Sequence, residues 1–281
     1  MAFLSEAHKS TSPYQPMQIF SYTDQELLSQ GFQRADSLSL GQRLLIETLY
    51  STLEKIKVFW WDRFRSVGID NHGKIPPFFV HFQDNNAYYH PPTSEVPEHF
   101  TFNDQYVRSP EVVAHEFTHG VIEWLNPLGN QGEAGAINES ISDVVGIVFK
   151  RSLTDKFGRP IYNDWKIDGF RDLSKTFTVS NWRTTQPTYD HQGTTTNDHG
   201  NVHHNSLLLS HAFYLASVQV EKYDPSNQKL LNIWIKAVES LSADEKNFNG
   251  FANKTIQLAF PYGGEPIQEI VKSAWKQVGL Q

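Results

Sequence analysis

The sequence contains no cysteine. Disulfide bonds and thiolate ligands to zinc are therefore excluded, and any metal ion would have to be bound by histidine and carboxylate side chains. No apolar run approaches the length of a membrane span, and Met1–His8 lack the basic segment and the long apolar stretch of a signal peptide. We therefore expect a soluble chain that makes no membrane contact.

Positive charge is also scarce. The chain has 24 basic and 31 acidic residues, a net charge of −7, and no basic patch with interleaved aromatic residues. A nucleic-acid partner is therefore not expected. With 281 residues, of which 13% are aromatic, the chain can bury a substantial core as one large domain or two small ones, and we expect a monomer.

The segment Val112–Gly120 carries two histidines at helical spacing. His115 and His119 are four residues apart, so on an α-helix their imidazoles lie on one face and can share one metal ion. Glu116 projects about 100° round the helix from His115, which suits a general base acting on a metal-bound water better than a third ligand. The helix should begin just before this segment, at a capping residue, a first-turn proline and an acidic residue: Ser109, Pro110 and Glu111.

A catalytic zinc site needs a third protein ligand and leaves a fourth position for water. Glu139, twenty residues after His119, supplies a carboxylate, and Asp143 follows it four positions later on the same helical face. A metal-bound imidazole needs its other N–H held by a carboxylate or a carbonyl group, and Asp143 and Asn138 are available for this. The pattern predicts a zinc ion bound by His115, His119 and Glu139.

The N-terminal part of the chain, residues 1–124, should contain a sheet. Residues 1–40 predict loops and short strands, and apolar residues at helical spacing from about Leu40 to Val67 predict a long amphipathic helix. The aromatic-rich runs Pro77–Phe82 and His99–Phe102 predict strands that form the wall of a cleft.

The C-terminal part, residues 125–281, should be mainly helical. The helix that carries Glu139 should run to about Ser152, and a polar stretch with little periodicity follows from Thr154 to Asn201. Four later segments have helical spacing: Leu207–Glu221, Gln228–Leu241, Asn249–Phe260 and Pro266–Val278. The expected fold is therefore α+β, with a sheet-containing N-terminal part, a mainly helical C-terminal part and the metal between them.

Three blocks of this sequence, in order and with matching gaps, resemble the thermolysin-like zinc endopeptidases. They are HEFTH at His115–His119, GAINESISD at Gly135–Asp143, and NDHGNVHHNS at Asn197–Ser206. In the third block the resemblance implies that Asp198 orients a histidine that faces the substrate carbonyl. That histidine is His203, and not His199 or His204. It also implies the family's two-part fold.

The resemblance implies hydrolysis of a peptide bond. Zinc would lower the pKa of its bound water to around 7 and polarise the scissile carbonyl, while Glu116 would take the water's proton and pass it to the leaving amine. His203 would stabilise the oxyanion. Asn85–Tyr88 is similar to the family's edge-strand stretch, in which Asn86 and Ala87 would hold the substrate as an added strand, and Arg171 would bind its backbone carbonyl.

The resemblance also implies a substrate preference. Val112 and Phe170 match apolar positions that line the family's specificity pocket, and Ile167 is a further candidate. Cleavage is therefore expected on the amino side of a bulky apolar residue.

The chain departs from the family pattern in two places. Asn130 stands where the family has a tyrosine whose hydroxyl is a second oxyanion donor. The family's calcium site beside the zinc helix has lost two carboxylates, because its positions here are Glu111, Lys150, Asp164 and Lys166. We therefore expect no calcium there, and we expect Lys150 to pair with Glu111 and with Asp164 or Asp168 instead.

Two other functions are open to this sequence. A zinc-binding relative with little activity could serve as a peptide-binding or inhibitory protein, although Glu116 argues against it because a binder needs no general base. A zinc hydrolase of another kind is discouraged by the edge-strand and Arg171 matches, which serve extended peptides. The family resemblance implies secretion, whereas the missing signal peptide leaves a mature form or a cytoplasmic branch open.

Overall fold

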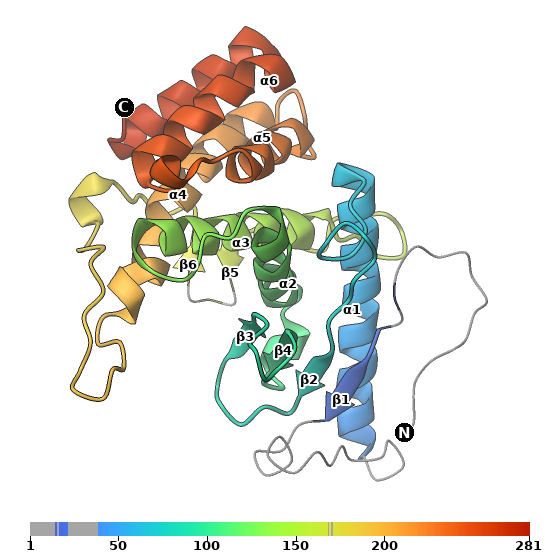
Figure 1. Cartoon of the computed structure of the whole chain (residues 1–281). Helices are drawn as coiled ribbons and strands as arrows, with labels where there is room; N and C mark the ends of the chain where they lie inside the picture. Colours follow the sequence, from blue (N-terminus) through green and yellow to red (C-terminus); the bar gives the residue numbers. More distant parts are fainter. Residues whose placement is uncertain (1–14, 16, 22–38, 168, 170) are drawn as a thin grey trace. The chain divides into compact units, whose positions relative to one another are not determined.

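The computed structural model describes residues 15, 17–21, 39–167, 169 and 171–281. The chain forms two compact units, the first ending at Trp124 and the second comprising Leu125–Gln281. Figure 1 shows the helices and strands of both units, coloured along the sequence.

The first unit combines a four-stranded sheet with helices. The strands lie in the order β1-β2-β4-β3, in which β1, β2 and β4 run parallel and β3 pairs antiparallel with β4 at one edge. The elements are β1 (Ile19–Ser21), α1 (Leu40–Phe64), β2 (Phe78–Val80), β3 (Ala87–His90), β4 (His99–Phe102), the short 3-10 helix η2 (Tyr106–Arg108) and α2 (Pro110–Leu125). The two predicted strands and the helix from Leu40 are confirmed.

Local signals explain where α1 begins and ends. Ser39 and Gln42 form a capping box, since the Ser39 hydroxyl accepts from the Gln42 N–H and the Gln42 side chain accepts from the Ser39 N–H. The helix ends where Arg65 adopts a left-handed conformation with φ 54°. Its buried face consists of residues at helical spacing, among them Leu49, Leu53 and Ile56.

An aromatic layer holds α2 against the sheet. The ring of Phe100 on β4 stacks on Phe78 of β2 at 4.6 Å between centroids and on Phe117 of α2 at 6.3 Å. Gly120 is needed here, because a Cβ atom at this position would lie only 3.2–3.3 Å from Phe100, Ile69 and Tyr89. A side chain at this position would require these neighbours to shift by a few tenths of an ångström.

The second unit is mostly helical. Its helix α3 packs on α4, and α4 and α5 pack on α6. At its centre the indole rings of Trp234 and Trp275 stack 5.9 Å apart, and Trp275 Nε1 donates to Thr255 Oγ1 over 2.7 Å. The elements are α3 (Gly132–Ser152), β5 (Lys166–Ile167), β6 (Arg171–Asp172), η3 (Val179–Asn181), α4 (Asp198–Val220), α5 (Gln228–Glu239), η4 (Ala243–Glu245) and α6 (Phe248–Val278).

Two helix boundaries differ from expectation. Helix α4 begins at Asp198 and not at Leu207, because residues 198–201 form a left-handed turn, with φ between 52° and 98°, that leads directly into the regular helix. The two last predicted helices form one element, α6, interrupted at Gly264 with φ 77° and ψ 178°. Pro261 and Pro266 flank that break. The two helices expected from the sequence lie on either side of it.

The expected α+β fold class is confirmed, with the sheet in the first unit and a mostly helical second unit. Within the part of the chain that the structure describes, no helix combines the length and apolar character needed to cross a membrane.

Candidate functional site

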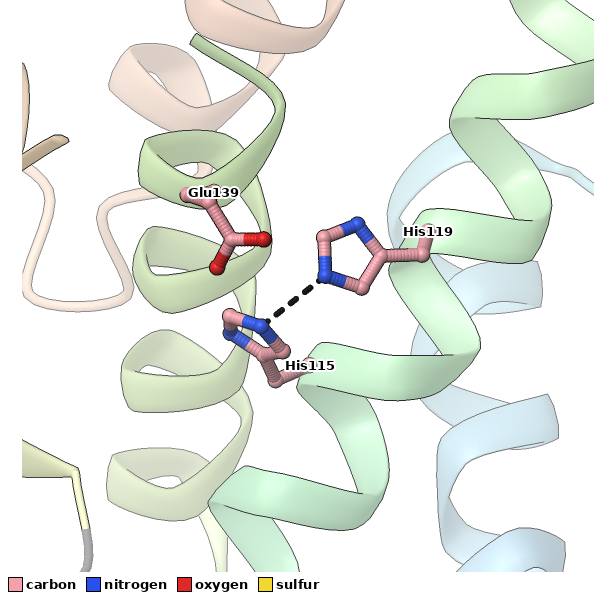
Figure 2. A group of neighbouring side chains, drawn as sticks. All are labelled: His115, His119 and Glu139. Carbon is pink, nitrogen blue, oxygen red and sulfur yellow. Dashed lines mark hydrogen bonds between the residues drawn. The ribbon is translucent and has the colours of Figure 1, made fainter. Parts of the chain in front are cut away.

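Helix α2 presents both predicted histidine ligands on one face. Nε2 of His115 lies 3.0 Å from Nε2 of His119, and the two rings are nearly perpendicular, at 86°. Figure 2 shows this pair on α2, together with Glu139, which α3 contributes. His115 is buried and His119 is partly exposed.

The histidine pair suits a metal ion. Two nitrogens bound to one tetrahedral zinc, each at about 2.0–2.1 Å, lie roughly 3.3 Å apart, close to the separation found here. At 3.0 Å at least one of the two Nε2 atoms must be unprotonated, which is the form that binds a metal. His115, His119 and Glu139 make up a group of side chains that could hold a metal ion.

Glu116 is buried on α2 and is held by the sheet. Its Oε2 accepts a hydrogen bond of 2.9 Å from the backbone N–H of Tyr89 on β3. The backbone of an edge strand therefore fixes one carboxylate oxygen of the expected general base. This contact could not be predicted from the sequence, because Tyr89 precedes Glu116 by 27 residues and no motif joins them.

His203 joins two carboxylates in the second unit. Its Nε2 lies 3.2 Å from Oε2 of Glu139, and its Nδ1 lies 2.9 Å from Oδ1 of Asp198. The other oxygen of Asp198 accepts from the His203 N–H over 3.1 Å. The left-handed turn at 198–201 makes this double contact possible, since it folds the Asp198 side chain back over the start of the regular helix.

Two nearby carboxylates act on the pKa of His203. Burial acts to lower the pKa of His203, but the negative charge of Glu139 and the hydrogen bond to Asp198 outweigh it, so the pKa lies above its ordinary value.

The other two histidines of this segment make different contacts. Nε2 of His204 lies 2.9 Å from the Asn181 carbonyl oxygen, and its ring packs against Phe177. His199 donates its backbone N–H to Thr195 Oγ1.

Asp143 is fully buried and forms a two-point ion pair with Arg171. Nε and Nη2 of Arg171 donate to the two carboxylate oxygens of Asp143 over 2.7 and 2.6 Å. A pair of this geometry fixes the guanidinium plane as well as neutralising the carboxylate. Asn138, on the same helix, donates to the Gly129 carbonyl oxygen over 3.0 Å and so ties the preceding loop to α3.

The same loop packs tightly on α3. A Cβ atom at Gly135 would lie 2.5 Å from the carbonyl carbon of Asn130, so only glycine permits this approach of the loop backbone. Asn130 itself is exposed.

The expected substrate-binding residues have different surroundings. Ala87 on β3 is buried, and its N–H donates to the Asn86 side chain over 3.0 Å. Val112 and Ile167 are buried as well. Phe170 and Asp168 lie outside the described residues.

Lys150 occupies the position where the sequence suggested a lost calcium site. Its Nζ donates to Oδ1 of Asp164 and to the carbonyl oxygen of Lys166, both over 3.0 Å, which confirms the predicted pair with Asp164. Lys166 contributes through its backbone, since its N–H also donates to Asp164, whereas its side chain is exposed.

Comparison with known proteins places these features in a family. A sequence model described as the thermolysin metallopeptidase catalytic domain matches residues 23–123, and one described as the thermolysin metallopeptidase alpha-helical domain matches residues 127–280.

Curated relatives match over different lengths. An extracellular metalloprotease of Pectobacterium carotovorum subsp. carotovorum is 27% identical over 274 residues, which cover 88% of this chain and 76% of the relative. A thermolysin of Alicyclobacillus acidocaldarius is 30% identical over 182 residues, 60% of this chain but only 33% of that protein.

Among solved structures, the precursor of protealysin, a metalloproteinase from Serratia proteamaculans, shares the fold. The TM-score is 0.72 at 22% identity, and the superposition covers 99% of this chain and 91% of the other.

Proposed function

The chain belongs to the thermolysin family of metallopeptidases, and on that premise we propose that it is a zinc-dependent endopeptidase. The observation that carries the proposal is the arrangement on α2. Two imidazole nitrogens face each other at 3.0 Å, and the intervening turn presents a buried carboxylate held by a backbone N–H. A protein that only bound peptides would have no use for that carboxylate.

The proposed zinc ligands are His115, His119 and Glu139, a set of two imidazoles and one carboxylate typical of catalytic zinc. When bound, zinc supplies Lewis acidity, lowering the pKa of a water molecule and polarising a carbonyl group. We assign to Asp143 and Asn138 the support of this ligand set. Asp143 is suited to that because its pairing with Arg171 holds it in one orientation.

Glu116 is the proposed general base. With Oε2 bonded to the Tyr89 N–H, the second oxygen is the one we assign to the proton of the attacking water. Glu116 would then deliver that proton to the leaving amine, which must be protonated to depart. Its burial supports this role, because proton transfers to a carboxylate are protected from bulk water there.

His203 is the proposed donor to the oxyanion, with Asp198 holding its Nδ1–H. Nδ1 of His203 is bonded to Asp198, so Nε2 is the nitrogen that we assign to the oxyanion. A donor of this kind is typically worth ~3 kcal/mol of barrier.

For the substrate we propose an extended peptide added to the β3 edge at Asn86 and Ala87, with Arg171 as a donor to its backbone. Val112 and Phe170 are the proposed pocket residues, and cleavage is proposed on the amino side of a bulky apolar residue. The position of β3 at the end of the sheet supports strand addition, since an edge strand has unpaired backbone groups on one side.

One observation favours a second candidate, a zinc-binding relative of low activity that binds peptides. Asn130 replaces a tyrosine donor, and its backbone packs against Gly135.

The relatives include a protein named as extracellular, and we extend export to this chain as part of the proposal.

Hydrolysis of a broad peptide library by the zinc-loaded protein tests these proposals together. The matched control is the His115→Ala, His119→Ala double variant. The endopeptidase proposal predicts internal cleavage before bulky apolar residues, lost in the control along with the zinc. Tight peptide binding without products would support the second candidate, and cleavage mainly beside charged residues would refute the proposed pocket.

A further inference from the structure

Tyr89 contacts Glu116 through its backbone and is anchored through its side chain. The backbone N–H donates to Oε2 of Glu116 over 2.9 Å, and the hydroxyl donates to Oε2 of Glu98 over 3.0 Å. One residue therefore links the buried carboxylate of α2 to a second buried carboxylate at the start of β4.

Glu98 is itself held from two further directions. Lys74 Nζ forms an ion pair with Oε1 of Glu98, and Trp124 Nε1 donates to Oε2 over 3.2 Å. The Lys74 ammonium also lies 4.6 Å from the centre of the Trp124 ring, an additional cation–π contact. Only 3% of Glu98 is exposed, so its carboxylate is stabilised by Lys74, Tyr89 and Trp124 rather than by water.

The Tyr89 ring has little freedom between its two ends. It packs on Phe100 with centroids 5.2 Å apart, and its edge faces Gly120, where a Cβ atom would lie 3.3 Å from Cε2. Burial and the charge of Glu98 raise the pKa of the Tyr89 hydroxyl, so it stays protonated and continues to donate. The ring is therefore held against α2 at Gly120, one helical turn after Glu116.

This anchoring matters because β3 is an edge strand. Its Tyr89 lies opposite Phe100 on β4, and no strand beyond β3 in the described sheet supports its other side. Edge strands move more easily than central ones, and a carboxylate held only by an edge amide would move with it. A clamp on the Tyr89 side chain removes that motion.

From these contacts we infer that Tyr89 is a positioning residue for Glu116, fixed in place by Glu98, Lys74 and Trp124. The inference rests on the proposed role of Glu116 as general base. A base that is misaligned by a fraction of an ångström loses much of its effect, and losing the clamp should reduce kcat about tenfold. KM should change little, because none of the clamp groups is assigned to the substrate.

The test uses zinc-loaded full-length variants. Tyr89→Phe removes the donor, and Glu98→Leu removes the acceptor while leaving the partly exposed Lys74 able to reach water. Glu98→Gln keeps an acceptor oxygen and is the conservative variant. Tyr106→Phe removes a hydroxyl from another buried tyrosine of the same unit and is the matched control.

Four quantities are measured for each variant: zinc content, melting temperature, kcat and KM on a peptide cleaved by the wild type, and the NMR shift of the amide proton at position 89. We expect kcat about tenfold lower in Tyr89→Phe and in Glu98→Leu, with full zinc content. The double variant should be no slower than either single variant, because both remove the same contact. Glu98→Gln should recover most of the rate.

The amide proton provides a readout that needs no activity. A carboxylate acceptor draws this resonance downfield, so Glu98→Leu and Glu116→Gln should both move it upfield, and Tyr106→Phe should not. An unchanged amide shift, or an unchanged kcat in folded Glu98→Leu protein, would overturn the inference. An inactive wild type would instead refute the proposed function, and with it the catalytic meaning of the contact. If Tyr89→Phe does not fold, the two Glu98 variants decide.

Discussion

The ammonium group of Lys150 donates to Oδ1 of Asp164 over 3.0 Å. The lysine side chain is only 8% exposed and the aspartate 40%, so a buried cation is neutralised by a carboxylate at the surface. Burial acts to raise the pKa of Asp164, but hydrogen bonds from Lys150 and from the Lys166 N–H leave it below its ordinary value.

We expect Lys150→Met to lower the free energy of unfolding by about 1–2 kcal/mol, a modest loss because Asp164 is partly solvated. Lys166→Met is the control, and its free energy of unfolding should stay within about 0.5 kcal/mol of the wild-type value, since Lys166 contributes through its backbone. Denaturant unfolding measures both. The pKa of Asp164 is lowered in the folded state, so the difference between wild type and Lys150→Met should shrink as the pH falls below about 4. Equal losses in the two variants would contradict this.

Calcium should not stabilise the protein at this position. A calcium ion takes about six to eight oxygen ligands, and the Lys150 ammonium already occupies the oxygens of Asp164 and of the Lys166 carbonyl. Thermal unfolding of zinc-saturated protein should give the same melting temperature with and without millimolar calcium. A large, saturable rise that Glu111→Gln or Asp164→Asn abolishes would show that the site binds calcium despite its lysines.

His90 should make the first unit sensitive to acid. Burial, together with the adjacent His99 ring stacked at 4.4 Å, lowers the pKa of His90 to about 4. The unfolded chain takes up this proton near pH 6.5 and the folded chain does not, so stability is complete above that pH and falls as the pH drops toward 4, by on the order of 3 kcal/mol. In His90→Phe this part of the pH dependence should vanish. The lost hydrogen bond to Thr101 lowers the free energy of unfolding by the same amount at every pH and does not change the slope. Parallel stability curves from pH 7 to 4 would rule out the effect.

His203→Ala should reduce kcat by about two to three orders of magnitude while zinc content stays full. His199→Ala and His204→Ala are the matched controls from the same segment. His204→Ala should cost stability, since its ring packs on Phe177, but should leave kcat close to wild type. If one of the controls lost the rate and His203→Ala did not, the assignment within this block would be wrong.

The parts of the site that could be predicted are those encoded by spacing along one element. His115 and His119 face each other because four residues make about one helical turn, and the flanking proline and acidic residue indicated where α2 begins. The Lys150–Asp164 pair was predicted in another way, from the resemblance to the family's calcium site, in which lysines replace two of the carboxylates here.

Contacts between distant segments were not predictable in this way. The clamp on Tyr89 depends on the register that places Tyr89 opposite Phe100, on the close approach at Gly120, and on Glu98 entering a buried position at the head of β4. The only local signal was an acidic residue directly before the apolar strand His99–Phe102. Likewise, the left-handed turn at 198–201 contains two non-glycine residues beyond Asp198, so no periodicity marked the true start of α4.

The most direct test of the proposed chemistry is the pairing of zinc content with peptide hydrolysis in Glu116→Gln. Because Glu116 is the base and not a ligand, the variant should hold one zinc per chain, as the wild type does, while kcat falls by about three orders of magnitude or more. A Glu116→Gln protein that retained zinc and hydrolysed peptides at the wild-type rate would contradict the assignment of the general base.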